Sequence, residues 1–103
     1  MELKSGVVEF EWDKWNIDKS YVKHGVTQKE AEEVFLSNES FVKPDVKHSQ
    51  KEERFIILGK TNERINLFIV FTVRKDKVRV ISARRMHSKE VEKYEKAKKD
   101  TKI

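Results

Sequence analysis

The chain has 103 residues, which is enough for one small domain with a single hydrophobic core and too few for two. Charged residues make up 40% of it, and the absence of cysteine excludes disulfide frameworks, zinc knuckles and thiol nucleophiles. No apolar run approaches the roughly 20 residues of a membrane span, and the first residues do not form a signal peptide. We therefore expect a cytoplasmic protein without membrane contact, with residues 1–103 in one domain and loose ends at 1–6 and 100–103.

The net charge of +5 is concentrated in the C-terminal part of the chain. Residues 74–103 carry 12 Lys and Arg against 5 Asp and Glu, whereas residues 1–73 carry 11 against 13. Such a basic field is typical of a protein with a phosphate-bearing or acidic partner, because neutralising a polyanion releases its counterions. A solvated, Lys-rich helix over residues 89–102 is the alternative explanation for part of this charge.

The first third of the chain predicts a strand followed by two helices. Alternation over 7–12 indicates a short strand, and Asp13 is a good N-cap for a helix over 14–23 that ends before Gly25. Thr27 and Glu30 form a capping box for a second helix, which runs to about residue 37 and buries Ala31, Val34 and Phe35. The following residues, 38–52, contain the only proline and predict a connecting loop that also allows a short strand at Phe41-Val42.

The middle of the chain predicts an antiparallel meander of three strands, at 54–60, 65–74 and 77–84, joined by turns at 61–63 and 75–76. If the second turn is a two-residue hairpin, Arg74 faces Lys77, Phe71 faces Val80 and Val70 faces Ile81. One face of the meander is then the core, with Leu67, Ile69, Phe71, Val73, Val78 and Val80. The opposite, open face carries Thr72, Arg74, Arg79 and Arg85.

Strict alternation places Arg84 on the core side, and a bulge or the end of the strand would move it to the open side. After this strand, Ser88 predicts the N-cap of a last helix over 89–99. Its apolar face, made of Val91, Tyr94 and Ala97, is thin, so we expect this helix to dock lightly. The fold class is α+β, with a short N-terminal strand, two helices, a three-stranded antiparallel meander that completes one sheet, and a C-terminal helix.

The arginines of the meander are the main candidates for a functional site. Their planar guanidinium groups bind phosphate oxygens through two hydrogen bonds and stay protonated at any relevant pH. Strands that lie side by side can bring them together although they are far apart in sequence. The alternative is that some of them are ordinary surface charges. The set comprises Arg54, Arg74, Arg79, Arg84 and Arg85.

Six short phrases, in their order and spacing, resemble the BrnT family of bacterial toxins over residues 8 to 96. They are Phe10-Glu11-Trp12-Asp13, Lys23-His24-Gly25-Val26, Ala31-Glu32-Glu33-Val34-Phe35, Glu53-Arg54-Phe55, Ile81-Ser82-Ala83-Arg84-Arg85 and Glu92-Lys93-Tyr94-Glu95. The resemblance implies a RelE-like ribonuclease that is neutralised by a BrnA antitoxin with a ribbon-helix-helix domain. It also implies that the complex represses its own operon, so that operator DNA is contacted only through the antitoxin complex.

RNA cleavage without a metal needs groups that hold the phosphate and a group that transfers protons near neutral pH. The histidines are His24, His48 and His87, and His48 is the preferred proton-transfer group. His24 has a structural explanation as well, since a histidine at a helix C-terminus can bond the last carbonyls. We predict Arg84, Arg85, Arg54, Arg74 and His48 as catalytic residues, and Lys23, His24, Arg79 and His87 as RNA-binding residues.

We predict no metal and no cofactor. Asp45, His48 and Glu52 or Glu53 lie close in sequence, but their spacing fits no recognised metal motif. The phosphate loop and the dinucleotide fingerprint are also missing from the sequence. Two other functions stay open: a non-catalytic module that binds nucleic acid or a partner, and a degenerate toxin that keeps only antitoxin binding and operon repression.

Overall fold

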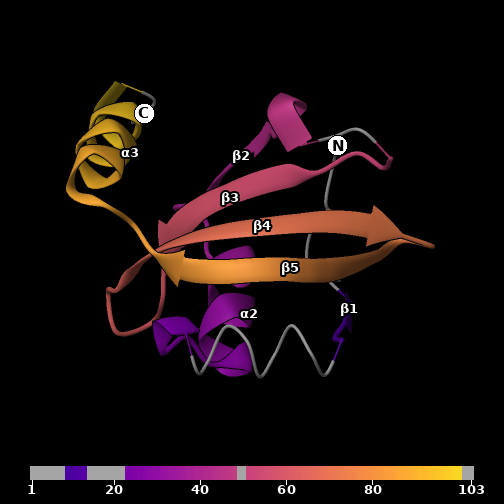
Figure 1. The fold of residues 1–103 in the computed structure, drawn as a ribbon. Coiled ribbons are helices and arrows are strands. Elements are labelled where there is room, and N and C mark those ends of the chain that lie inside the picture. The colour runs from indigo at the N-terminus through magenta and orange to yellow at the C-terminus, as the bar shows by residue number, and fades with distance from the viewer. Residues whose placement is uncertain (1–8, 14–22, 49–50, 101–103) are drawn as a thin grey trace.

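The computed structural model describes residues 9–13, 23–48 and 51–100 and has an α+β fold built on one sheet. Its elements are β1 (Phe10–Glu11), α2 (Gln28–Leu36), β2 (Phe41–Pro44), the 3-10 helix η1 (Val46–His48), β3 (Phe55–Lys60), β4 (Asn66–Arg74), β5 (Lys77–Arg85) and α3 (Ser88–Asp100). The strands lie in the order β1-β5-β4-β3-β2 (Figure 1). β1 pairs with β5 in parallel, and every other pair is antiparallel.

The sheet has one more strand than predicted, because β2 pairs with β3 along the edge of the sheet. The short strand that the sequence allowed at Phe41-Val42 is therefore formed, and it extends to Pro44 within the stretch predicted as a connecting loop. Pro44 is tolerated there because the next residue, Asp45, donates its N–H inward to the Arg54 carbonyl at 2.8 Å. Backbone direction alternates along a strand, so the missing N–H of Pro44 faces away from β3. The proline thus also protects the edge against pairing with other chains.

Helix α2 confirms the capping box and its predicted buried residues. The Glu30 amide donates to the Thr27 hydroxyl at 3.1 Å, and the Thr27 amide donates to the Glu30 carboxylate at 2.9 Å. Ala31, Val34 and Phe35 are buried against the sheet. The helix that we predict over 14–23 lies outside the described residues, apart from Lys23, which has helical backbone, as does His24 after it.

The hairpin between β4 and β5 has the two-residue turn that we predict. Lys75 and Asp76 have φ values of 51° and 66°, and the right-handed twist of a hairpin favours such a turn. The predicted register holds from Arg74 opposite Lys77 to Phe71 opposite Val80. This part of the meander is therefore fixed by the turn.

A β-bulge follows immediately and changes which arginine faces which side. Val70 pairs with Ser82 and not with Ile81, so Ile81 is an extra residue in β5. Beyond the bulge, Arg84 lies opposite Phe68 on the open face and Arg85 lies opposite the buried Leu67. The predicted pairing of Val70 with Ile81 and the placement of Arg85 on the open face were therefore wrong.

The core lies between α2 and the sheet and is closed by aromatic contacts. The Phe35 ring packs edge-on against Phe10 and Phe71, with centroid distances of 5.4 Å and 4.9 Å. On the sheet, the core residues predicted from alternation are buried, except for Val73, which is half-buried. They are joined by Ile57 of β3 and by Ala83 beyond the bulge.

Helix α3 stands beside the end of the sheet where β5 stops, away from α2 (Figure 1), and contacts β2 through Tyr94 and Phe41. Its first intrahelical bond runs from the Val91 amide to the His87 carbonyl, so the N-cap is His87 and not Ser88 as predicted. Tyr94 is its one buried residue, and its hydroxyl donates to the Glu39 carbonyl at 2.7 Å. No helix in the described ranges is long and apolar enough to cross a membrane.

Candidate active site on the open face of the sheet

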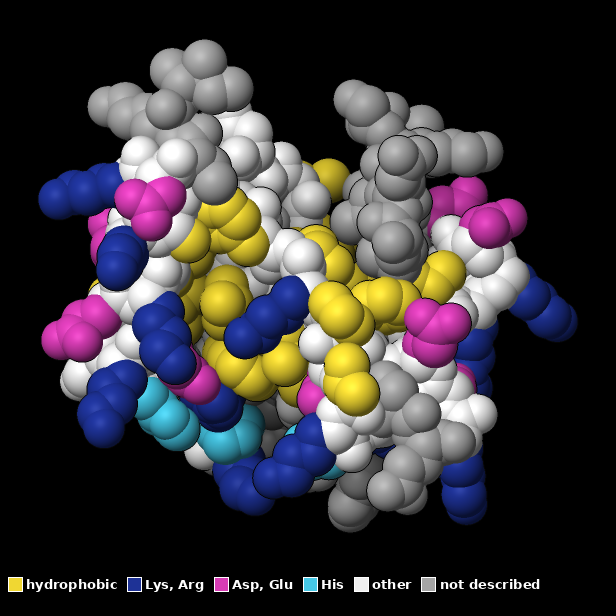
Figure 2. Space-filling view, turned by 90° about the horizontal axis from the view of Figure 1, so that it is seen from above, with side chains coloured by type: hydrophobic (Ala, Val, Ile, Leu, Met, Phe, Trp, Pro, Cys, Tyr) yellow, Lys and Arg dark blue, Asp and Glu magenta, His cyan; other side chains and the backbone are white. Residues whose placement is uncertain are grey.

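The face of the sheet opposite to α2 carries a shallow hollow of about 360 Å³, which we call the open-face hollow. Its floor is apolar, and its rim carries cations, a histidine and a carboxylate. Figure 2, seen from above, shows exposed hydrophobic side chains with Lys, Arg and His side chains gathered beside them. The lining residues are Asp45, His48, Arg54, Ile56, Phe68, Val70, Ile81, Ser82 and Arg84.

Arg84 reaches the hollow because of the bulge in β5. Its guanidinium carbon lies 4.0 Å from the centroid of the Phe68 ring, so the group stacks on the apolar floor. Glu90 of α3 accepts from both of its terminal nitrogens, at 2.8 Å and 2.9 Å. This hydrogen-bonded pairing with Arg84, together with the His87 amide, lowers the pKa of Glu90 to about 2.

His48 enters the hollow from η1 and is held by a carboxylate. Its Nδ1 lies 3.1 Å and 3.0 Å from the two carboxylate oxygens of Asp45. The Asp45 side chain is only 9% exposed, whereas that of His48 is 59% exposed. The ring is therefore fixed at one nitrogen and open toward solvent on its other side.

Arg54 lines the same hollow and lies directly before β3 in the chain. Its carbonyl accepts from the Asp45 amide, so the backbone of Arg54 is tied to the residue that holds His48. The carbonyl of the preceding Glu53 accepts from the buried Thr72 hydroxyl at 2.6 Å. Both bonds set the position at which the Arg54 side chain leaves the sheet.

A second hollow of about 340 Å³ adjoins the first and shares His48 and Arg54 with it. It adds Lys47, Lys51 and Glu52 to the lining. We did not predict the two lysines as site residues. The available signal was their position on either side of His48 in the loop that precedes Arg54.

Other predicted site residues lie outside the open-face hollow. Arg74 donates to Glu52 at 3.0 Å and 3.1 Å, next to the second hollow, and this pairing lowers the pKa of Glu52. Arg79 binds Glu11 and Asp13, both at 2.9 Å, and so fastens the N-terminal strand to β5.

The remaining predicted residues also lie outside it. Arg85 is exposed at the end of β5, on the other side of the strand from Arg84. The His87 side chain is 74% exposed, with its Nδ1 3.8 Å from a Glu90 oxygen. Lys23 and His24 precede Gly25 on the chain and do not line either hollow.

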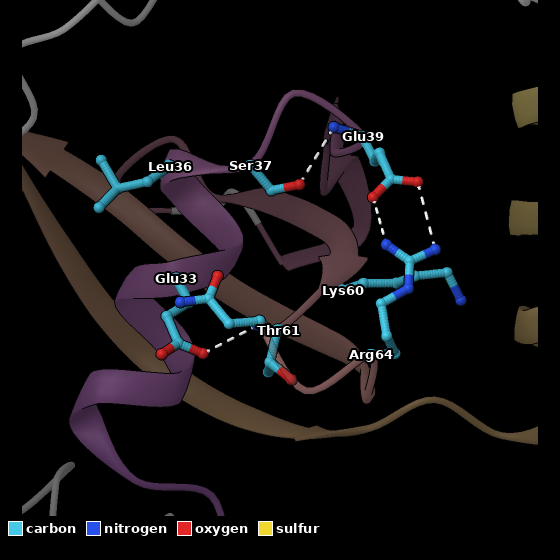
Figure 3. A pocket seen from close by; sticks show the side chains of 8 residues that line it. Glu33, Leu36, Ser37, Glu39, Lys60, Thr61 and Arg64 are labelled. Atoms are coloured by element: carbon cyan, nitrogen blue, oxygen red, sulfur yellow. Dashed lines mark hydrogen bonds and ion pairs between the residues drawn. The ribbon is translucent and has the colours of Figure 1, made fainter.

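A larger pocket of about 590 Å³ lies elsewhere, between the end of α2 and the loop after β3. Its polar groups already bind one another: Arg64 pairs with Glu39 at 2.6 Å, and Glu33 accepts from the Asn62 amide at 3.0 Å (Figure 3). It contains no histidine. The open-face hollow is the better candidate, because it combines arginines with a group that can transfer a proton.

The described part of the chain holds no group of three or more His, Cys, Asp or Glu placed to bind a metal ion. What the open-face hollow offers is two guanidinium groups, an oriented imidazole and an apolar floor. Guanidinium groups bind phosphate, imidazole exchanges protons near neutral pH, and apolar side chains accept a nucleobase by stacking. The arrangement suits a phosphodiester in a nucleic acid.

Comparison with known proteins places the chain in a family. The family model described as "Ribonuclease toxin, BrnT, of type II toxin-antitoxin system" matches residues 12–90. Among solved structures, the 1.1 Å crystal structure of the Brucella abortus ribonuclease toxin BrnT is similar, with a TM-score of 0.61 and 21% sequence identity over 80% of this chain and 100% of that one. No match was found among curated proteins. Because the family match spans well over half of its residues, the chain belongs to the BrnT family of ribonuclease toxins of type II toxin–antitoxin systems.

Proposed function

We propose that this toxin cleaves RNA without a metal ion, in the open-face hollow. The substrate's 2′-hydroxyl attacks the adjacent phosphorus, the bond from phosphorus to the 5′-oxygen breaks, and a 2′,3′-cyclic phosphate remains. His48 accepts the proton of the 2′-hydroxyl, and water supplies a proton to the departing 5′-oxygen. The observation that carries this proposal is that His48, Arg54 and Arg84 line one hollow although they lie on three different segments.

The arginines supply the electrostatic part of the reaction. The phosphorus gains negative charge in the transition state, and fixed cations at the rim stabilise it. The carboxylate of Glu90 already binds Arg84 through two parallel hydrogen bonds, which is also how a guanidinium binds a phosphate. A phosphate of the substrate would compete with Glu90 for this group, with Arg54 as the second cation.

The second hollow supports a polymeric substrate. Lys47 and Lys51 extend the positive charge beyond His48 and Arg54, away from Arg84. A chain of phosphates can follow such a basic track, and binding along it would weaken steeply with salt. The apolar floor beside Arg84, made of Ile56, Val70 and Ile81, would take an unstacked base, which favours single-stranded RNA.

Single substitutions test the assignment. His48→Ala should lower cleavage about 10²- to 10⁴-fold, the range of general acid–base catalysis. Arg54→Ala and Arg84→Ala should each lower it roughly 10²-fold through lost charge stabilisation. Lys29→Ala, on the exposed side of α2, is the control for loss of a cation. Full activity of the His48 variant in a folded protein would refute the assignment.

The mechanism has its own test, which uses the substrate. Excess chelator should leave cleavage unchanged, and the products should carry a 2′,3′-cyclic phosphate. Replacing the 2′-hydroxyl at the cleaved position by hydrogen should abolish cleavage and leave binding nearly intact, because phosphate contacts dominate affinity. Cleavage of the deoxy substrate, or activity that appears only with added divalent metal, would contradict the proposal.

The partner would be a BrnA-like antitoxin with a ribbon-helix-helix domain, and the complex would bind operator DNA through that domain. Membership in a type II family supports a protein antitoxin, and the basic rim of the hollow fits an acidic covering segment. Hydrogen exchange on free and bound toxin tests the surface. Protection over residues 72–99 should increase, and unchanged protection there would count against it.

A purely binding module remains the second candidate, and one observation favours it. Bonds to Glu90 and to the Arg85 carbonyl take three of the five N–H donors of Arg84. If Glu90 kept this group permanently, the hollow would bind RNA weakly and would not cleave it. Cleavage separates the two functions: Glu90→Gln releases Arg84 and should raise RNA affinity in either case, but a binding module would not cut the RNA that it binds.

A further inference from the structure

We infer that Asp45 is a positioning residue for His48, and the inference rests on the proposed ribonuclease function. The Asp45 carboxylate is nearly buried and accepts from Nδ1 of His48 through both oxygens, at 3.1 Å and 3.0 Å. The imidazole itself is largely exposed. A buried carboxylate thus holds one ring nitrogen, and the other ring nitrogen is the one available to the substrate.

The local backbone makes this pair rigid. Asp45 directly precedes η1, and the His48 amide donates to the Asp45 carbonyl at 3.2 Å, which closes the turn. Two side chains three residues apart on a helical turn lie on the same side of it. The Asp45 amide donates to the Arg54 carbonyl, so the turn is fastened to β3 beside the second residue of the proposed site.

The chemistry follows from the donor and acceptor inventory. An ionised carboxylate only accepts hydrogen bonds, so neutral His48 carries its proton on Nδ1 and presents the Nε2 lone pair to the hollow. When Nε2 takes the proton of the 2′-hydroxyl, Nδ1 keeps its own proton and the resulting imidazolium lies beside the carboxylate. Asp45 takes no proton in this step.

The surrounding charges make this carboxylate important. The charged groups that line the two hollows around His48 are Asp45, Lys47, Lys51, Glu52, Arg54 and Arg84. Four of them are cations, which oppose the formation of an imidazolium. Glu52 is engaged by Arg74, so among these residues Asp45 is the anion in contact with the ring.

Asp45→Asn tests the inference. Asn starts helical turns as well as Asp does, so the fold should survive, but the amide has no charge and can also donate to Nδ1. We expect kcat to fall roughly 10²-fold with KM within about twofold, because only the transition state contains the imidazolium. Glu63→Gln, which removes a carboxylate from a distant loop, is the matched control.

Nitrogen NMR of the His48 ring gives a readout that does not depend on cleavage. The native protein should show neutral His48 protonated at Nδ1, and the Asp45→Asn protein should shift toward the Nε2-protonated form. A native ring protonated mainly at Nε2, or an Asp45→Asn enzyme with native kcat, would refute the role of Asp45 and leave the proposed ribonuclease function standing. The proposed function itself is refuted by a different result, a folded His48→Ala protein that still cleaves RNA.

Discussion

Arg84 and Glu90 form the most strongly perturbed contact of the site. The pKa of Glu90 lies at about 2, well below its ordinary 4.5, because Arg84 donates two hydrogen bonds to its ionised form. A lowered pKa in the folded state means that the ion pair stabilises the protein above about pH 4.5. That contribution is lost as the pH falls from about 4.5 toward 2.

We therefore predict how Glu90→Gln changes stability with pH. At neutral pH the variant should be less stable than the native protein, and the difference in free energy of unfolding should shrink to almost nothing by about pH 2. Denaturant unfolding across this range measures the difference. Glu92→Gln, on the exposed side of the same helix, should show little change at any pH, and an equally large effect there would contradict the assignment.

Thr72 is a buried polar residue whose hydroxyl holds the backbone next to Arg54. Replacing it by Val keeps the shape but removes the donor for the Glu53 carbonyl, so we expect a loss of about 1–2 kcal/mol in the free energy of unfolding. Thr72→Ser keeps the hydroxyl and should lose less. Because the same carbonyl precedes Arg54, the Val variant should also cleave RNA more slowly. Chemical denaturation and cleavage rates of both variants check the two effects.

At the scale of the elements, the bulge in β5 decides which arginine serves the site. Val80 lies on the core side, Ile81 has no partner in β4, and Ser82 resumes the ladder on the open side. The extra residue reverses the alternation for the rest of the strand. If the same sequence paired without a bulge, Arg84 would occupy a core position and Arg85 would face the hollow.

Two deletions in β5 should therefore behave oppositely. Removing Ile81 restores a regular ladder and leaves Arg84 on the open face, so the protein should fold and keep the ion pair with Glu90. Removing Ala83 turns Arg84 toward the core, which should cost several kcal/mol because a charge is buried without its partner. Thermal unfolding of both proteins compares them. Equal stability of the two would show that β5 does not pair as described.

The bulge also marks where sequence reasoning stops. The meander and its register near the turn could be predicted from the sequence. Apolar residues alternate in both strands, at Val78 and Val80 and from Leu67 to Val73, and a two-residue turn joins them. The bulge depends on how two strands fit over a shared core, and local alternation gives only an indirect sign of it, the charged Arg84 at a core position. In the same way, the pairing of Asp45 with His48 depends on the turn at η1, which the sequence presented only as a polar loop.

At the scale of the whole molecule, α3 is attached mainly through polar contacts. Tyr94 is its anchor, lying against Phe41 at 5.7 Å between ring centroids and donating to the Glu39 carbonyl. Lys98 adds a hydrogen bond of 2.8 Å to the Glu39 carboxylate. With a single buried side chain, this helix depends on Tyr94 remaining neutral.

High pH should accordingly release α3. Burial raises the pKa of Tyr94 to about 12 from its ordinary 10.0. The stability that the neutral phenol gives to the folded protein is therefore fully present below about pH 10 and is lost as the pH rises through about 12. Circular dichroism should show loss of helix over this range. Tyr94→Phe cannot ionise and should keep its helix there, although it should be about 1 kcal/mol less stable at neutral pH for want of the hydroxyl. If the native and Tyr94→Phe proteins lost helix over the same pH range, Tyr94 would not be the anchor of α3.

The parallel pairing of β1 with β5 also governs the order in which a newly synthesised chain can fold. Phe10 pairs with Val78, so β1 can join the sheet only after β5, the last strand, has left the ribosome. The meander needs only neighbouring segments and can form early, whereas closing the long connection to β1 is slow because of its entropy. Arg79, which binds Glu11 and Asp13, completes that closure. A cell that makes this toxin therefore has an interval during translation in which the protein is incomplete, and an antitoxin already present could meet it then.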